Sequence, residues 1–236
     1  MRIHYLSAFF AAFVLISFSA NSQLSSSLWT PTSELSMPFD LTAAQIKAHK
    51  ASYYQVDVET VRAVLSGAAD ETSIWLPNNQ SEFTSFKIFR NTTFSEGFSA
   101  VFPNIGTYTI IADNNRNKWG KLEISHKGIR AMIFTPGEST TFIDPVFQNN
   151  TSFYMVYEKR DFYTSKLANC LVETGDTKYK PSESKSGEPY NDCELKTYRI
   201  AIAATGEYTT FHGGTAEDAA AAIATTMNRV NGVYER

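Results

Sequence analysis

Residues 195–236 read LKTYRIAIAATGEYTTFHGGTAEDAAAAIATTMNRVNGVYER and divide into three segments of different character. Residues 197–205 form a short apolar run with β-branched side chains, which predicts a buried strand. Residues 206–214 are rich in glycine, polar and aromatic residues and predict a loop. The alanine-rich residues 216–234 predict a long helix. This order of strand, loop and helix is typical of the start of an α/β domain.

Two features define the helix expected over residues 216–234. Thr215 stands three residues before Asp218, which is the spacing of a helix N-cap with an acid in the first turn. Apolar residues recur at helical spacing and form one face, made of Ala219, Ile223, Met227 and Val230. A single strand offers this face little to pack on, and an exposed stripe of this kind usually marks a missing partner. We therefore expect residues after Asp192 to be mobile or poorly packed.

The same stretch resembles the opening of the catalytic domain of reprolysin-like (adamalysin-type) metzincin zinc peptidases, most closely the secreted bacterial members. The resemblance rests on the Thr-Tyr-Arg strand, the Thr-Gly-Glu-Tyr…Phe-His-Gly loop and the helix end with Asn228, Asn231, Tyr234 and Arg236. It implies that the parent protein is a zinc endopeptidase in which zinc-bound water attacks the peptide carbonyls of protein substrates. The alternative is an unrelated α/β domain that also begins with a strand and an amphipathic helix.

The zinc ligands of such an enzyme are absent from the printed sequence. Metzincins bind zinc through His-Glu-x-x-His-x-x-Gly-x-x-His. The four histidines are His4, His49, His126 and His212; none precedes a glutamate, and no two lie four residues apart. We therefore expect this chain alone to bind no zinc and to be non-catalytic, as a truncated fragment of the parent enzyme. We expect His126, within the turn sequence Ser-His-Lys-Gly, to be a solvated turn residue rather than a ligand.

The N-terminal residues have the composition of an export signal. Arg2 precedes an apolar run over residues 6–18 that suits a signal peptide and is too short to span a bilayer. Small residues at positions −3 and −1 predict cleavage between Ser22 and Gln23. An N-terminal membrane anchor is the alternative. We expect a secreted protein, free of the membrane after signal removal, in a compartment that permits disulfides.

Composition argues against some partners and favours a sizeable β-rich core. The chain has 21 Lys and Arg against 24 Asp and Glu, a net charge of −3, and no basic cluster. Nucleic acid and anionic membranes are therefore poor partners. Aromatic residues, at 14% of the chain, are spread widely and can support a large core.

From residue 73 onward the apolar residues alternate with a period of two. This pattern predicts strands over residues 74–76, 84–89, 108–112, 121–125, 129–135, 140–143 and 153–157. Before them we expect a disordered lead over residues 23–38 and short helices over residues 42–50 and 58–66, the second capped by Asp57. The predicted fold class is α+β. A sandwich or curled antiparallel sheet over residues 39–173 is followed by a linker and an incomplete α/β opening.

This β-rich region resembles reprolysin-type propeptides. The phrases FPNIGTY at residues 102–108, GIRAMI at 128–133, TFIDP at 141–145 and YMVYEKRD at 154–161 follow one another in the propeptide order. The resemblance implies that this region assists folding of its own catalytic domain, the intramolecular partner, and keeps it latent. It gives Arg130, Asp144 and residues 159–161 a structural role.

Residues 174–192 break the pattern. They are almost entirely polar, so they cannot bury enough surface to become ordered. Exposed backbone around Lys178, Lys180 and Lys185 is where a maturing protease would cut. A plain interdomain linker is the alternative. After it, residues 193–236 would be the truncated start of the catalytic domain.

Cys170 and Cys193 flank this segment, and three arrangements remain open. They can pair with each other, which would stabilise the chain by about 3 kcal/mol. Cys193 can instead pair with a cysteine beyond Arg236. In the third arrangement, suggested by metzincin propeptides, the Cys170 thiolate occupies the open position of the zinc as a latency switch. Residues 169–172 lack the Pro-x-x-Cys-Gly context of such switches.

A second function hypothesis belongs to a different class. The chain would be a complete secreted β-rich binding or inhibitory module without catalysis, directed at a separate protease. The coding sequence after Arg236 distinguishes the two hypotheses, because only the fragment continues into a zinc-binding motif.

Overall fold

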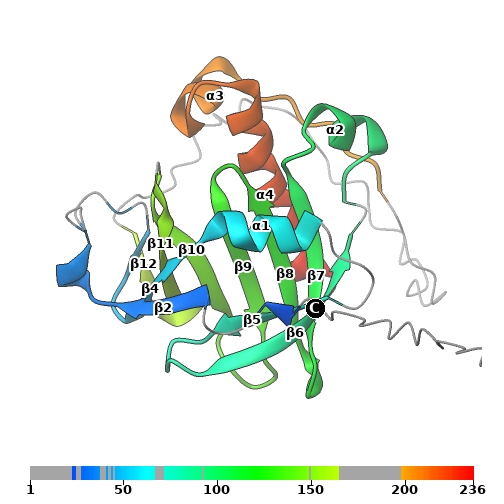
Figure 1. Ribbon diagram of the computed structural model, residues 1–236. Helices are drawn as coiled ribbons and strands as arrows, with labels where there is room; N and C mark the ends of the chain where they lie inside the picture. Colours follow the sequence, from blue (N-terminus) through cyan, green and yellow to red (C-terminus); the bar gives the residue numbers. More distant parts are fainter. Residues whose placement is uncertain are drawn as a thin grey trace, which may run out of the picture.

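The computed structural model describes residues 23–24, 28–37, 41, 44, 46–66, 72–91, 93–148, 150–164 and 198–236. Within them a ten-stranded sheet runs in the order β1-β5-β6-β7-β8-β9-β10-β11-β4-β2 and curls until it nearly closes (Figure 1). The neighbouring strands are antiparallel, apart from the parallel pair β1 and β5.

The strands of this sheet range from two to eleven residues in length. They are β1 (Gln23–Leu24), β2 (Trp29–Thr32), β4 (Ala51–Val56), β5 (Ser73–Pro77), β6 (Phe83–Arg90), β7 (Gly106–Ala112), β8 (Asn115–Ser125), β9 (Gly128–Phe134), β10 (Thr141–Phe147) and β11 (Asn150–Glu158). A separate two-stranded sheet joins β3 (Lys47–Ala48) to β12 (Phe162–Tyr163). Two short 3-10 helices, Glu34–Ser36 and Lys159–Asp161, complete this part.

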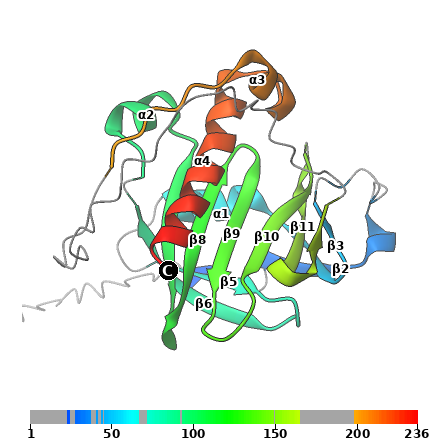
Figure 2. The same cartoon turned by 180° about the vertical axis from the view of Figure 1, so that it is seen from behind.

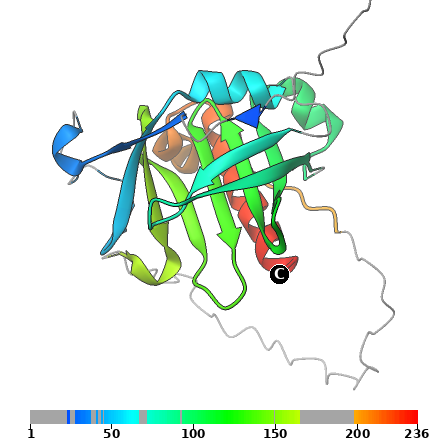
Figure 3. The ribbon, with the colours of Figure 1, turned by 60° about the horizontal axis from the view of Figure 1, so that its bottom comes forward.

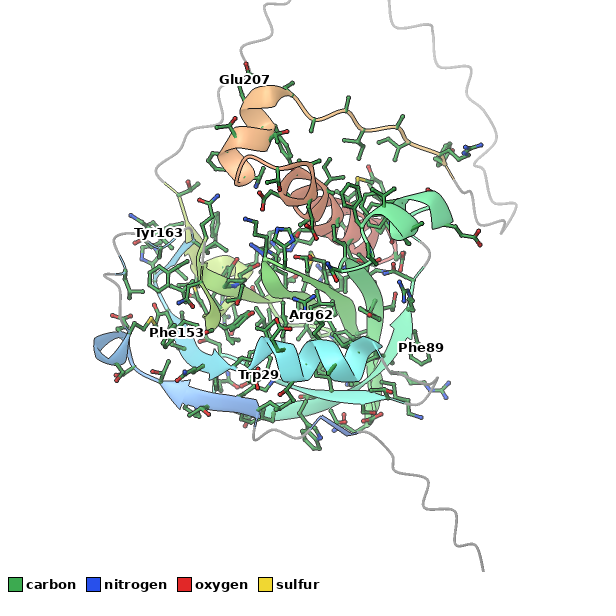
Figure 4. The ribbon with its side chains drawn as sticks, turned by 45° about the horizontal axis from the view of Figure 1, so that its top comes forward. Trp29, Arg62, Phe89, Phe153, Tyr163 and Glu207 are labelled. Carbon is green, nitrogen blue, oxygen red and sulfur yellow. The ribbon has the colours of Figure 1, made fainter. Side chains whose placement is uncertain are left out.

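The inside of the curled sheet holds the main hydrophobic core. Because side chains alternate across a strand, every second residue points inward. The largest buried members are Trp29, Tyr54, Phe86, Ile110, Leu122 and Tyr154. Helix α1 (Val58–Ser66) closes this interior with Val61 and Leu65. Arg62 on the same helix reaches the sheet, where its Nη2 donates to the Ser125 carbonyl at 2.8 Å (Figure 4).

Three further helices lie on the outer side of the sheet. The longest, α4 (Ala216–Tyr234), runs along β8 on the face opposite α1 (Figure 2). Helix α3 (Gly206–His212) packs against the start of α4, with Glu207 exposed on its outer side (Figure 4). Helix α2 (Glu96–Val101) packs against α4 through Phe98. The view from below in Figure 3 shows how strongly the strands beneath these helices curve. None of the described helices combines the length and hydropathy needed to cross a membrane.

The structure confirms the predicted α+β class and the curled antiparallel sheet. Each of the seven strands expected from residue 73 onward is present, as β5 to β11. The helix over Val58–Ser66 is present, and Asp57 Oδ1 accepts hydrogen bonds from the backbone N–H groups of Glu59 and Thr60. The helix expected over residues 216–234 has the predicted bounds. These elements carry their signals locally, in alternation, periodicity and caps.

Four local predictions were wrong. Residues 198–205 form no strand, and Tyr198 and Ile200 are 86% and 69% exposed, because no strand edge lies beside them within the described residues. Residues 206–212 form α3 instead of a loop, with Thr205 as its N-cap. Residues 47–48 pair as β3 rather than continuing a helix. Residues 29–32, expected to be disordered, pair with β4 and bury Trp29.

The expectation that the last helix is poorly packed was also wrong. Ala221, Ala224 and Asn228 of α4 are buried. Small residues let the helix lie close to the sheet, which the apolar stripe could not reveal.

Candidate helix-docking site

Helix α4 begins with a capping box that also bonds to the sheet. Thr215 Oγ1 accepts from the Asp218 backbone N–H at 3.1 Å, and Asp218 Oδ2 accepts from the Thr215 hydroxyl at 2.7 Å. The other carboxylate oxygen, Asp218 Oδ1, lies 2.6 Å from Lys127 Nζ and 2.8 Å from His126 Nε2, in the turn between β8 and β9. Hydrogen bonds from His126 and Lys127 hold the pKa of Asp218 far below its usual range. The helix start is therefore fixed by an ionised carboxylate.

The face that α4 turns to the sheet consists of small or amide residues. Ala221, Ala224, Asn228 and Gly232 recur every three or four residues and are all buried. A Cβ atom added at Gly232 would lie 3.0 Å from Cγ of Lys121. This small face permits the close approach of helix and strand.

Asn228 joins the helix to the sheet at the middle of this face. Its Nδ2 donates to the Leu122 carbonyl at 2.9 Å, and its Oδ1 accepts from Asn91 Nδ2 at 3.0 Å. One turn on, Asn231 Nδ2 donates to Thr93 Oγ1 at 3.3 Å. A buried amide with both ends bonded fixes the position of the helix along the strand, because a shift would leave polar atoms unpaired.

An ion pair between a buried carboxylate and a partly exposed arginine lies beside Asn228. Asp144 on β10 is 1% exposed, and its Oδ1 accepts from Arg229 Nη2 at 2.6 Å. Its Oδ2 accepts from the Tyr157 hydroxyl at 3.0 Å, while Arg130 Nε stands 3.6 Å from Oδ1. Burial and the charge of Asp144 raise the pKa of Tyr157, which keeps its hydroxyl a donor. The Arg229 guanidinium also lies over the Phe142 ring, 5.1 Å from its centroid.

Two more charged residues of β8 lie under α4. Glu123 is 1% exposed, and its Oε2 accepts from the Thr225 hydroxyl at 2.7 Å, while Oε1 has no partner among the described residues. Burial raises the pKa of Glu123, against the opposing effect of Arg130. Lys121 Nζ donates to Glu235 Oε2 at 2.7 Å near the end of the helix. The outer face of β8 is therefore charged and is buried by the helix.

A small cavity of about 150 Å³ opens next to the helix start. Lys127, Arg130, His212 and Asp218 contribute to its walls. Burial, then the charges of Arg130 and Lys127, lower the pKa of His212. No group of three His, Cys, Asp or Glu residues suited to a metal occurs among the described residues, so they do not fit a zinc ion and no zinc chemistry is derived from them.

The predicted site residues fall into two groups. Ser22, Cys170, Cys193, Lys178, Lys180 and Lys185 lie outside the described residues, so the disulfide, latency thiolate and cleavage predictions stay predictions. Arg130 and Asp144, predicted to be structural, come together beneath α4. His126 lies in the turn after β8, as predicted, but its side chain is only 33% exposed because it lies beside Asp218.

Most of the predicted apolar face of α4 is turned away from the sheet, although its first residue, Ala219, is buried. Val230 is 38% exposed, and Ile223 and Met227 are only half-buried. Sequence reasoning missed the sheet-facing set Ala221, Ala224, Asn228 and Gly232. Its signal was a recurrence of small residues at the same helical spacing, roughly on the opposite side of the helix.

Residues 194–236 match the family model described as metallo-peptidase family M12B, reprolysin-like. Comparisons with curated proteins and with solved structures give no match. Helices α3 and α4 lie inside the matched range, whereas every strand of the curled sheet lies outside it. The match supports the predicted relationship to metallopeptidases, a class that implies zinc in a full-length parent. Helix α4, which contacts the sheet through Asn228, Arg229 and Asp218, thus belongs to a segment that is similar to reprolysin-like M12B metallopeptidases.

Proposed function

We propose that the β-rich region, residues 39–173, is the propeptide of a secreted reprolysin-like zinc endopeptidase whose catalytic domain starts at residues 193–236. The propeptide assists the folding of that domain and keeps it latent. The observation that carries the proposal is the docking of α4, which lies in the peptidase-like segment, onto the outer face of β8. The contacts include hydrogen bonds and ion pairs between charged and amide groups of the sheet and matching groups of this helix, which is what we expect of an intramolecular partner.

The folding role follows from what the sheet offers α4. A helix of this length without tertiary contacts is marginal in water, because most helical stability in proteins comes from packing. The β-rich region supplies a surface for the small face of α4 and a charged anchor for its first turn at Asp218. A bound, preformed α4 is then available as the catalytic domain folds.

Secretion and maturation complete the proposal. Residues 1–22 act as the signal peptide, cut between Ser22 and Gln23. Cleavage near Lys178, Lys180 or Lys185 separates the propeptide from the peptidase. After maturation the peptidase acts on protein substrates. Before maturation the partner of the propeptide is its own catalytic domain. Nucleic acid and membrane are not partners of the exported protein.

The first experiment reads the coding sequence beyond Arg236. A frame with His-Glu-x-x-His-x-x-Gly-x-x-His within about one hundred codons supports the proposal. An immediate stop codon refutes it and leaves the secreted binding or inhibitory module, which would be tested by isolating its partner.

The second experiment refolds that extended protein with and without residues 23–192. We expect a much lower yield of zinc-dependent peptidase when these residues are missing, and inhibition of the folded peptidase when they are added back. Equal yields together with no inhibition would refute both the folding and the latency role.

A further inference from the structure

Helix α4 has two chemically different faces, and the sheet uses only one of them. At about 100° per residue, Ala221, Ala224, Asn228 and Gly232 share one side of the helix. The large apolar residues Ile223, Met227, Val230 and Tyr234 lie roughly on the opposite side. Val230 and Tyr234 are exposed and Ile223 and Met227 are half-buried, so this side is less covered than the sheet-facing side.

The contacts of the sheet-facing side cover the full length of α4. Asp218 meets Lys127 at the first turn, Thr225 meets Glu123 and Asn228 meets Leu122 in the middle, Arg229 meets Asp144, and Glu235 meets Lys121 at the end. The partners come from β8, β10 and the turn after β8. Groups this far apart determine the direction and the position of the helix together.

None of these contacts requires a covalent connection between helix and sheet. The partners lie between 85 and 114 residues apart along the chain. Four of the sheet-side groups, Lys121, Leu122, Glu123 and Asp144, are buried, so the sheet side of each bond is shielded from water, although the partners Glu235 and Arg229 are partly exposed. Buried hydrogen-bonded pairs dissociate slowly, since opening leaves each partner to be solvated again.

We infer that the outer face of β8–β10 is a recognition surface that binds the segment 198–236 in trans and retains it after the chain between them is cut. It recognises a helix with small residues toward the sheet, an amide at position 228 and a guanidinium at position 229. The inference deepens the proposed function and rests on it only for the identity of the segment. The binding itself can be measured without a peptidase, so it can fail while the proposed function stands.

The test uses the full chain with a recognition sequence for a specific protease in place of residues 180–186. Cys170→Ser and Cys193→Ser are included so that no disulfide can hold the two parts together. After cutting, gel filtration at about 10 µM, a concentration that retains micromolar complexes, should show both parts in one peak. Separation of the two parts at this concentration would overturn the inference.

Variants of α4 then test which face is recognised. Asn228→Leu removes both hydrogen bonds of the buried amide and should speed release of the cut segment at least about tenfold. Val230→Ala, on the opposite side of the same turn, should change release by less than about twofold. If Asn228→Leu prevents folding of the uncut chain, Thr225→Val replaces it, since this substitution removes one hydroxyl donor and keeps the volume. Equal release rates for variants of the two faces would show non-specific adhesion and overturn the inference.

Discussion

The Arg229–Asp144 pair provides the most demanding test of how α4 is held. Arg229→Met keeps an unbranched side chain but removes the charge that Asp144 faces, together with the guanidinium that lies over the Phe142 ring. Asp144 then stays buried with the Tyr157 hydroxyl at 3.0 Å and Arg130 Nε at 3.6 Å. Breaking a buried ion pair costs about 3–5 kcal/mol. Because Arg130 remains close and the Arg229 side chain is 28% exposed, we expect a loss no greater than the lower limit, about 3 kcal/mol at pH 7.

Amide hydrogen exchange of α4 measures this loss directly. A helix that opens without the rest of the sheet exchanges through local unfolding, so its protection reports the docking free energy. A loss of about 3 kcal/mol corresponds to roughly a hundredfold faster exchange over residues 216–234. Amides of β5 and β6, away from α4, should keep their rates. Arg236→Met is the matched control, because it removes the same charge at the exposed end of the chain; its guanidinium lies 5.3 Å from the centroid of the Phe134 ring, so the loss should not exceed about 1 kcal/mol.

A double-mutant cycle with Asp144→Asn identifies the cause of the loss. If the cost of Arg229→Met comes from an unpaired buried carboxylate, removing that charge first should reduce the cost, with a coupling energy of at least about 1 kcal/mol. Exchange in Arg229→Met at the wild-type rate, or additive losses in the double variant, would refute the claim that this ion pair holds the helix.

Three further substitutions test other parts of the interface. Glu123→Gln should remove a pH dependence of stability. Burial raises the pKa of Glu123 in the folded protein, so the free energy of unfolding of the wild type should fall as pH rises above the ordinary pKa of glutamate. Urea titrations at pH 5 and 7.5 should show a smaller fall in the variant. Asp218→Asn should cost about 1–3 kcal/mol at pH 7. The pKa of Asp218 is lowered in the folded protein, so its carboxylate stabilises the fold above the ordinary pKa of aspartate and loses this effect as acid protonates it. The difference in stability between wild type and variant should therefore shrink below about pH 4. Gly232→Leu should cost about 1–3 kcal/mol by pushing the helix away from Lys121, whereas Gly206→Leu, where a Cβ meets open space, should stay within about 0.5 kcal/mol in the same titration.

The sequence predicted those elements whose signals are local. The alternation from residue 73 onward identified β5 to β11 because one face of each strand is buried in the core. Thr215 and Asp218 identified the start of α4 because a capping box needs only four consecutive residues. Short helices such as α2 and α3 have too few residues for a periodic pattern, and their caps at Ser95 and Thr205 were the remaining signals.

The docking of α4 could not be predicted in the same way. Lys121 and Glu123 on β8 have the pattern of a solvent-facing strand side, and only contact with a helix more than 90 residues later buries them. The stripe of Ile223, Met227 and Val230 dominated the helical pattern because large side chains carry most of the hydropathy. Ala221 and Gly232 contribute through their small size, which hydropathy does not measure.

The polar contacts of this interface favour specific docking of α4. Buried ion pairs add little net stability compared with apolar packing of the same volume, but an incorrect partner leaves Asp144 or Asn228 unpaired at a high cost. The outer face of β8 can therefore reject helices that an apolar groove would accept. When α4 leaves, the sheet exposes Lys121, Glu123 and Asp144, which water solvates readily. Release also uncovers Ile105 together with Phe94, Phe98 and Phe102, which pack against the alanines of α4, so an apolar patch lies beside these charged groups.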